Sequence, residues 1–133
     1  SALVVDGLTL EMLGTALNQK TSGEDRQPKW LLRIVERLNA EFLEFPSVVQ
    51  LAIDENVHPV YLARVFRRYY HQSIGEYVRN LQVKYSAELM LDLDLSLAQI
   101  ALQAGFSDQS HFTRVYKQAT GTTPGKYRKM LER

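Results

Sequence analysis

The chain has 133 residues, of which 45% are hydrophobic and 23% are charged, and its formal net charge is +1. This length supports a buried core of about one domain. No apolar run reaches the roughly 18 residues that a membrane span requires. No signal-peptide pattern is present either, so we expect no membrane association and a cytoplasmic location. The absence of cysteine excludes disulfides, thiolate zinc sites and a cysteine nucleophile.

The charge is distributed unevenly along the chain. Residues 1–45 carry five basic and seven acidic side chains, a net charge of −2, whereas residues 46–133 carry eleven basic and eight acidic ones, a net charge of +3. The overall pI of about 8.0 lies below the value of about 9 that is usual for nucleic-acid-binding domains. Composition alone therefore does not establish DNA binding, and the placement of the basic residues has to decide.

Proline and polar stretches divide a chain that otherwise has the pattern of helices. Residues 3–19 have apolar side chains at helical spacing, and the polar residues 20–27 predict a linker. Pro28 suits the first turn of the next helix, which Phe45-Pro46 ends. Ser47 is expected to cap the helix that follows. The apolar stripe of the helix after Pro28 consists of Trp30, Leu31, Ile34, Val35, Leu38 and Phe42.

Two helix pairs follow, and they are copies of one motif. The first pair is predicted at 47–55 and 59–70, and the second at 97–104 and 108–119, with Ser96 as a cap. Similar residues recur at an offset of 49 positions and, after one inserted residue, at an offset of 50. The matching residues are Ala52/Ala101, Asn56/Gly105, Val57/Phe106, Leu62/Phe112, Arg64/Arg114, Phe66/Tyr116, Arg67/Lys117, His71/Gly121, Ser73/Thr123, Gly75/Gly125 and Tyr77/Tyr127.

Each pair contains a tight turn that needs one residue at positive φ. Glycine adopts this conformation freely, and asparagine tolerates it better than most residues do. Gly105 and Asn56 occupy that position, and Pro59 and Asp108 suit the starts of the helices that follow. A solenoid needs three or more repeats. Two copies of a short helix, a tight turn and a basic helix indicate instead two DNA-reading modules in one chain.

A long helix is predicted between the two modules, over residues 74–91. At 1.5 Å per residue it spans about 27 Å, which approaches the roughly 34 Å between successive major-groove faces of B-DNA. A rigid helix of this length is expected to hold both modules on one side of a duplex. A last short helix is predicted over 124–131. The apolar face of the long helix carries Tyr77, Val78, Leu81, Tyr85, Leu89 and Met90.

A recognition helix buries one face and presents the other to base edges. The inward residues are expected to be Leu62, Val65 and Phe66 in the first module and Phe112, Val115 and Tyr116 in the second. Arginine suits guanine, glutamine suits adenine, and a methyl group can meet thymine. The first module has fewer hydrogen-bonding groups, so we expect it to contribute less specificity. The predicted base-contacting residues are Val60, Ala63, Arg64, Gln109, Ser110, Thr113 and Arg114.

A second set of residues is predicted to contact the DNA backbone. Basic side chains further along the two recognition helices suit phosphates, and exposed amides at the start of the helix after each reader attract them as well. Lys84 is expected to be surface charge only. The predicted backbone-contacting residues are Arg67, Arg68, Ser73, Lys117, Thr123, Lys126 and Arg128.

The second module closely resembles the signature of the AraC/XylS family of bacterial transcription regulators. The resemblance covers about residues 46–130. The first module departs from the family pattern at three positions, where His58 replaces the usual serine, Asn56 the usual glycine, and His71 the glycine that corresponds to Gly121. Gln82 stands where the connecting helix often has arginine. The signature is the run Ile100-Ala101-x-x-x-Gly105-Phe106-Ser107-Asp108-Gln109-Ser110-His111-Phe112-x-Arg114-x-Tyr116-Lys117-x-x-x-Gly121-x-x-Pro124-x-x-Tyr127-Arg128.

The resemblance implies an all-α, seven-helix DNA-binding domain with two helix-turn-helix subdomains joined by a long connecting helix. Residues 1–27 would then be a linker helix and polar linker from a missing N-terminal sensor or dimerisation domain. The DNA-binding domain would occupy residues 28–133, with the first module at about 28–73, the connecting helix at about 74–91 and the second module at about 92–133.

The resemblance also implies what the protein does. It would bind double-stranded promoter DNA through adjacent major grooves and activate transcription through contact with RNA polymerase. A small-molecule effector would act only through the missing N-terminal domain. We expect the fragment itself to be monomeric and to need no cofactor.

An enzyme is the first alternative. His58, His71 and His111 lie 13 and 40 residues apart, without the i, i+4 spacing of a helical metal pair. Asp92 and Asp94 are two residues apart, and such side chains diverge on a helix. No glycine-rich phosphate loop or nucleophile elbow is present. We therefore expect neither a catalytic residue nor a metal site.

The second alternative is a helical protein-interaction module that keeps the helix-turn-helix geometry but has reduced or lost DNA binding. The low net charge leaves this alternative open. A salt titration separates the two, because DNA binding through six or more phosphate contacts weakens by orders of magnitude between about 50 and about 200 mM salt. An apolar protein interface is expected to change little over that range.

Overall fold

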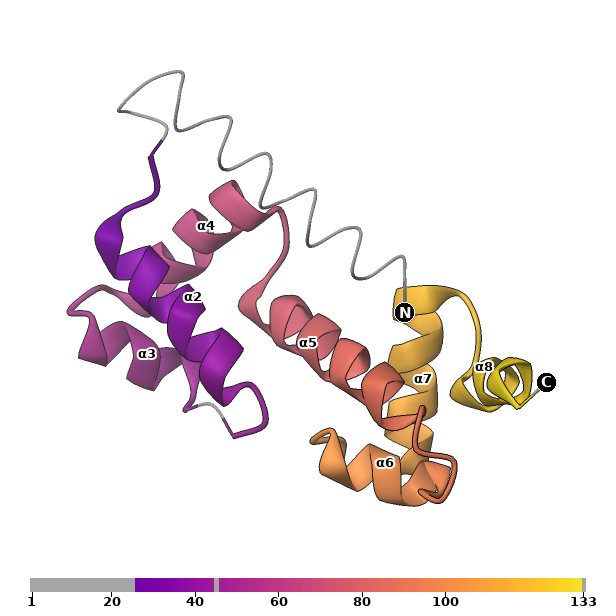
Figure 1. The fold of residues 1–133 in the computed structure, drawn as a ribbon. Helices are drawn as coiled ribbons and strands as arrows, with labels where there is room; N and C mark the ends of the chain where they lie inside the picture. The colour runs from indigo at the N-terminus through magenta and orange to yellow at the C-terminus, as the bar shows by residue number, and fades with distance from the viewer. Residues whose placement is uncertain (1–25, 45, 133) are drawn as a thin grey trace. The chain divides into compact units, whose positions relative to one another are not determined.

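The computed structural model describes residues 26–44 and 46–132, and all the regular structure in these ranges is helical. The predicted helix over residues 3–19 lies outside the described residues, as does most of the predicted linker. An all-α fold of seven helices, within the described residues, confirms the predicted fold class. In chain order (Figure 1) the helices are α2 (Lys29–Glu41), α3 (Val48–Asp54), α4 (Pro59–Tyr70), α5 (Ile74–Leu89), α6 (Leu97–Gln103), α7 (Gln109–Thr120) and α8 (Pro124–Leu131).

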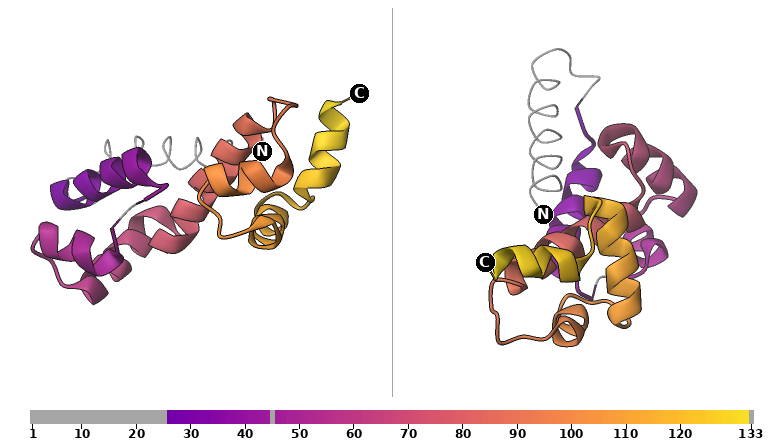
Figure 2. Two further views of the ribbon diagram at one scale, coloured as in Figure 1. Left: turned by 90° about the horizontal axis from the view of Figure 1, so that it is seen from below. Right: turned by 90° about the vertical axis from the view of Figure 1, so that its right-hand side faces the viewer.

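The chain divides into two compact units, and the boundary falls within α5, between Val78 and Arg79. Helices α2, α3 and α4 and the first part of α5 belong to one unit. The rest of α5 belongs to the other, with α6, α7 and α8. In each unit two short helices joined by a tight turn follow one preceding helix, which is α2 in the first unit and α5 in the second (Figure 2).

Apolar side chains from all four helices form the core of the first unit. Aromatic rings make up its centre, because Phe66 stacks on Tyr70 with ring centroids 4.8 Å apart and Tyr77 meets both rings edge-on. Burial of Phe66 and of its neighbours confirms the inward face predicted for α4. The buried side chains are Leu31, Ile34, Leu38, Leu51, Ala52, Leu62, Val65, Phe66, Tyr70, Ile74, Tyr77 and Val78.

The core of the second unit has the same plan around Phe112, whose ring lies 5.1 Å from that of Phe106 and meets Tyr116 edge-on. Burial, with a smaller effect from Tyr127, raises the pKa of Tyr116 well above its usual value, so its hydroxyl stays protonated. The inward face predicted for α7 is confirmed. The buried side chains include Leu81, Val83, Met90, Ile100, Ala101, Ala104, Phe106, Phe112, Val115 and Tyr116.

Side-chain caps start three of these helices where the sequence predicts them. The Ser47 hydroxyl accepts a hydrogen bond from the Gln50 amide at 3.1 Å, and the Asp108 carboxylate accepts one from the His111 amide at 2.7 Å. Ser96 and Gln99 form a reciprocal capping box. Each cap satisfies an amide that no helical carbonyl can reach.

Two helices end earlier than the sequence predicts. Helix α2 ends at Glu41 rather than at Phe45-Pro46, and α5 ends at Leu89 rather than at about residue 91. In both places the chain tightens into a turn with bonds between residues three apart, such as Glu44 N–H to the Glu41 carbonyl at 3.0 Å. Such bonds satisfy the last carbonyls of a helix while turning the chain away.

Candidate nucleic-acid interface

The turn inside each helix pair depends on one left-handed residue. Asn56 has φ 56° and Gly105 has φ 89°, as predicted. The next residue closes each turn in the same way. The amide of Val57 donates to the Ala52 carbonyl at 2.9 Å, and the amide of Phe106 donates to the Ala101 carbonyl at 2.9 Å. The two turns therefore share one hydrogen-bond pattern, as the repeat in the sequence indicates.

A second left-handed residue ends the second helix of each pair, α4 or α7. His71 follows α4 with φ 57°, and Gly121 follows α7 with φ 83°. Both donate their amide to the carbonyl four residues back, at 2.8 Å. A residue with a side chain loses about 1–2 kcal/mol in this conformation, whereas glycine does not. The first unit thus carries a non-glycine residue at both left-handed positions.

Helices α4 and α7 start with different caps. Asp108 caps α7, whereas α4 begins with Pro59 and is capped by the imidazole of His58, whose Nδ1 accepts a hydrogen bond from the Val60 amide at 3.1 Å. The sequence shows His58 only as a departure from the usual serine. Its capping role was missed because histidine is not among the residues that commonly cap helices.

The predicted base-contacting residues of the second unit lie on the surface of α7. Gln109, Ser110 and Arg114 are exposed and Thr113 is half-buried, while Phe112 on the opposite face is buried. Within the described part of the chain, these four polar side chains make no hydrogen bond or ion pair. Their donors and acceptors are therefore available to a ligand at the start of the helix.

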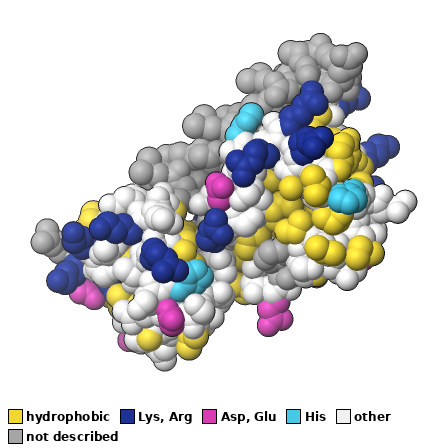
Figure 3. Space-filling model, turned by 180° about the vertical axis from the view of Figure 1, so that it is seen from behind, with side chains coloured by type: hydrophobic (Ala, Val, Ile, Leu, Met, Phe, Trp, Pro, Cys, Tyr) yellow, Lys and Arg dark blue, Asp and Glu magenta, His cyan; other side chains and the backbone are white. Residues whose placement is uncertain are grey.

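The corresponding face of α4 is mostly apolar. Val60, Ala63 and Arg64 are exposed, with Val60 at 60%. Beside them the half-exposed ring of Tyr61 packs against Trp30 of α2, with ring centroids 6.0 Å apart. Only Arg64 among the three predicted residues can donate a hydrogen bond from its side chain. Figure 3 shows one face of the molecule, on which hydrophobic side chains are exposed as well as Lys and Arg.

Most of the cations predicted to contact phosphates are exposed and unpaired. Arg67, Arg68, Lys117 and Lys126 all lie at the surface. The guanidinium of Arg68 lies 5.9 Å from the ring centroid of Tyr69. Among the residues that the structure describes, none of these four cations pairs with a carboxylate. No described carboxylate therefore neutralises these side chains, and they are available to an anionic partner.

The remaining predicted backbone contacts have structural roles as well. Ser73 accepts a hydrogen bond from the Glu76 amide at 3.1 Å, and Thr123 caps α8 by accepting one from the Lys126 amide at 3.2 Å. Arg128 is half-buried, and its Nη2 donates to the Asp92 carbonyl at 2.8 Å. The structure thus commits part of the Arg128 guanidinium to the protein itself.

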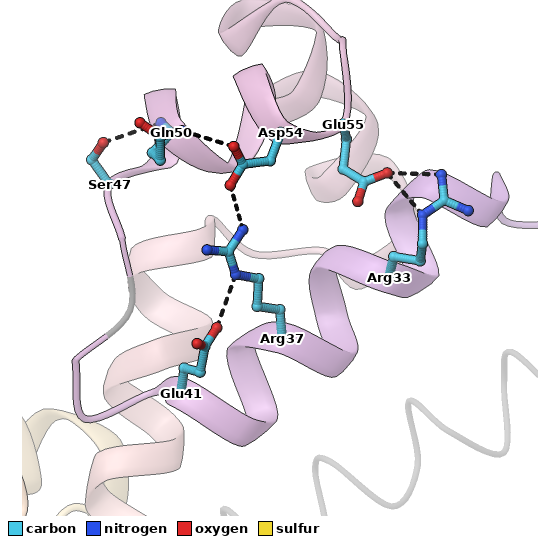
Figure 4. A network of polar contacts seen from close by, with 7 residues as sticks. All are labelled: Arg33, Arg37, Glu41, Ser47, Gln50, Asp54 and Glu55. Carbon is cyan, nitrogen blue, oxygen red and sulfur yellow. Dashed lines mark hydrogen bonds and ion pairs between the residues drawn. The ribbon is translucent and has the colours of Figure 1, made fainter.

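Ion pairs among the described residues lie in a network between α2 and α3 (Figure 4). Arg33 pairs with Glu55 at 2.7 Å. Arg37 pairs with Glu41 at 2.9 Å and with Asp54 at 2.6 Å. The hydrogen bond from Arg37, followed by one from the nearby Gln50, lowers the pKa of Asp54, and the carboxylates raise the pKa of both arginines. The pairs of Arg33 and Arg37 with Glu55 and Asp54 join α2 to the end of α3.

The described residues contain no group of three or more His, Cys, Asp and Glu side chains placed to hold a metal ion. None of the described helices combines the length and the apolar character needed to cross a membrane.

Comparison with known proteins gives consistent matches. A family model described as a helix-turn-helix domain matches residues 51–130. The probable transcription factor PqrA of Proteus vulgaris is 40% identical over 68 residues, which is 51% of this chain and 56% of that protein. The regulatory protein SoxS of Salmonella typhimurium is 34% identical over 71 residues, 53% of this chain and 66% of that protein. The chain thus spans little more than half of the first of these relatives.

Solved structures match over most of the chain. The C-terminal domain of AraT, a response regulator from Geobacillus stearothermophilus, aligns with a TM-score of 0.71 and 26% identity over 79% of this chain and 88% of that one. A regulator from Chromobacterium violaceum, of the group that contains AraC-type DNA-binding domains, aligns with a TM-score of 0.69 and 26% identity over 77% and 91%. The chain therefore belongs to the AraC/XylS family and contains the helix-turn-helix DNA-binding domain of a transcription regulator.

Proposed function

We propose that this chain recognises a specific promoter sequence by inserting α4 and α7 into the major groove of double-stranded DNA. One observation carries the proposal. The same helix-turn-helix geometry occurs twice, each time with one face of the second helix buried and the other exposed. Arg64 and Arg114 occupy corresponding positions on the two exposed faces, and neither has an ion-pair partner among the described residues.

The base contacts of the two units are proposed to differ in kind. On α7, Arg114 suits guanine, Gln109 suits adenine, and Ser110 and Thr113 add hydroxyl groups. On α4, Val60 and Ala63 can pack only against apolar groups such as thymine methyls, and Arg64 provides the polar contact. The second unit is therefore proposed to supply most of the base discrimination.

Contacts to the DNA backbone are proposed for the exposed cations Arg67, Arg68, Lys117 and Lys126, which would fix the register of the protein on the duplex. The starts of α5 and α8, at Ser73 and Thr123, are proposed to offer helix N-terminal amides to phosphates. The Arg128 guanidinium has its Nη2 held by the Asp92 carbonyl and its Nε buried, so only its Nη1 is proposed for the same role.

The proposed organisation follows the prediction from the sequence. Residues 1–27 serve as a linker from a sensor or dimerisation domain, and residues 28–133 read two adjacent major grooves. One helix, α5, continues from the first unit into the second. We propose a cytoplasmic activator that contacts RNA polymerase and receives its effector signal through a separate sensor domain, while these 133 residues by themselves are monomeric.

Selection of bound sites from random duplexes, followed by a salt titration on the selected site, tests this function. We expect two short conserved blocks about 10 base pairs apart, and an affinity that falls by orders of magnitude between about 50 and about 200 mM salt. Lys117→Ala should reduce the slope of log affinity against log salt concentration by about one. Lys84→Ala, which removes a cation of α5 expected to be surface charge only, should leave the slope unchanged. An unenriched pool, or salt-insensitive binding, would favour a protein-interaction module instead.

A further inference from the structure

Gln82 of α5 forms a part-buried hydrogen bond to the turn of the second unit. Its Nε2 donates to the carbonyl oxygen of Gly105 at 3.1 Å, and the side chain is only 9% exposed. Among the described residues, this carbonyl accepts no hydrogen bond from a backbone amide. The buried group in this pair is the amide of Gln82. A buried donor needs a partner to be stable, and the Gly105 carbonyl provides it.

The corresponding position of the first unit makes a corresponding contact. The offset of 49 residues that aligns Asn56 with Gly105 also aligns Arg33 of α2 with Gln82 of α5. Arg33 reaches Glu55, the residue before Asn56, with Nη2 to Oε1 at 2.7 Å. In both units a side chain of the preceding helix thus holds the turn, by an exposed ion pair in one and by a buried neutral amide in the other.

The orientation of the Gly105 peptide affects the start of α7. The next amide, that of Phe106, closes the turn on Ala101, and α7 begins at Gln109, after Asp108 as its cap. A rotation of the Gly105–Phe106 peptide would therefore displace the first turn of α7. That turn carries Gln109 and Ser110, two of the four α7 side chains proposed to read bases.

We propose that Gln82 is a positioning residue for the second recognition helix. It holds the Gly105 carbonyl so that α7 presents its exposed face in one orientation. The consequence for DNA rests on the proposed function, whereas the effect on the turn is a property of the free protein. Loss of the Gln82 donor should therefore loosen the turn and lower base discrimination in one half of the site, rather than weaken all DNA binding equally.

The first experiment measures the turn without DNA, in the full 133-residue chain. Gln82→Met keeps the approximate length of the side chain and removes the donor, and Gln103→Met makes the same change at an exposed position of α6. We expect amide hydrogen exchange at Phe106 to become about tenfold faster in Gln82→Met, which corresponds to the loss of one hydrogen bond of about 1.4 kcal/mol. The Gln103→Met control should not change it. Unchanged exchange at Phe106 in Gln82→Met would overturn the proposal.

A second variant covers the case in which Gln82→Met does not fold. Gln82→Arg supplies a longer donor, and it should retain slow exchange at Phe106. In contrast, Gln82→Glu places a carboxylate against the carbonyl and should give the fast exchange. Equal exchange in the Arg and Glu variants would show that the donor is not what holds the turn, and would also overturn the proposal.

The second experiment measures discrimination on the selected DNA site. We expect the affinity ratio between the matched site and one altered in the half read by α7 to fall about fivefold to tenfold in Gln82→Met. The affinity ratio between the matched site and one altered in the half read by α4 should stay constant. Equal losses for both halves would contradict a positioning role. If the unmodified chain showed no base preference but Phe106 responded as expected, the proposed function would fail and the positioning role would stand.

Discussion

The two helix-turn-helix units share one backbone plan but use different chemistry to maintain it. The first holds its turn with exposed ion pairs and places Asn56 and His71 at the two left-handed positions. The second holds its turn with the buried amide of Gln82 and places Gly105 and Gly121 at those positions. A duplicated fold therefore need not have duplicated stability, because the same geometry carries more backbone strain in one copy and depends on more salt-sensitive contacts there.

Their reading faces differ as well. The exposed face of α4 offers apolar groups and one arginine, whereas the exposed face of α7 offers two hydroxyls, an amide and an arginine. Trp30, the single tryptophan of the chain, lies in the first unit and packs against Tyr61. Its fluorescence therefore reports on the first unit alone, while circular dichroism reports on both.

The largest effect is expected from Gly105→Val. A β-branched residue is strongly disfavoured at a φ of 89°, so we expect the variant to lose about 3 kcal/mol of unfolding free energy. Denaturant unfolding followed by circular dichroism should show the loss. The Trp30 fluorescence transition should move less than the circular dichroism transition does. An unchanged circular dichroism transition would show that the turn does not depend on a glycine.

The next largest effect is expected from Arg114→Ala. Loss of a bidentate base contact should weaken binding to the selected site by about 2 kcal/mol and relax the preference at one base position. Competition binding with single-base variants of the site measures both changes. Arg64→Ala is the matched variant in the first unit, and Lys117→Ala on the same helix should weaken binding to all sequences alike. Uniform weakening by Arg114→Ala would assign that residue to a phosphate.

His71→Gly should stabilise the first unit. Relief of the left-handed conformation contributes about 1–2 kcal/mol, and the larger entropy of glycine in the unfolded chain offsets part of it, which leaves about 0.5–1 kcal/mol. The midpoint of the Trp30 fluorescence transition should rise. Gly121→Ala is the reverse test in the second unit. It should destabilise although, among the described residues and apart from the two chain neighbours, no atom lies within 4 Å of the added Cβ. A stabilising alanine there would contradict the strain argument.

The smallest effect concerns pH and salt. Arg37 lowers the pKa of the Asp54 carboxyl, so their interaction stabilises the first unit above about pH 4, the usual range of an aspartate. This stabilisation is lost as the pH falls through the lowered value. The melting midpoint reported by Trp30 should drop less with acid in Asp54→Asn than in the unmodified chain.

Added salt should lower the melting midpoint reported by Trp30, because exposed ion pairs are screened. An equal salt response of both units would contradict the difference drawn between their turns.

Local signals account for the parts of the fold that could be predicted. Ser47, Ser96 and Asp108 cap helices through contacts that span only a few residues, and Asn56 and Gly105 identify the turns because few residues tolerate positive φ. The exposed face of α7 follows in the same way from helical periodicity. The contacts of these residues with DNA remain predictions.

Contacts between distant parts of the chain could not be predicted. Arg33 and Glu55 lie 22 residues apart, Gln82 and Gly105 lie 23 apart, and Arg128 reaches a carbonyl 36 residues away. In the sequence Gln82 is only a departure from a family pattern, and Arg128 is only a cation near a helix start. Periodicity shows which face of a helix is buried, but not which partner a polar side chain meets there.

By itself, the amino-acid sequence determined the helices, the two turns, the inward faces and the family, because caps, left-handed residues and apolar spacing act within a few residues of one another. Only the tertiary structure decided how each turn is held and which cations remain unpaired. Those outcomes depend on which side chains folding brings within hydrogen-bonding distance, and sequence separation contains no such information.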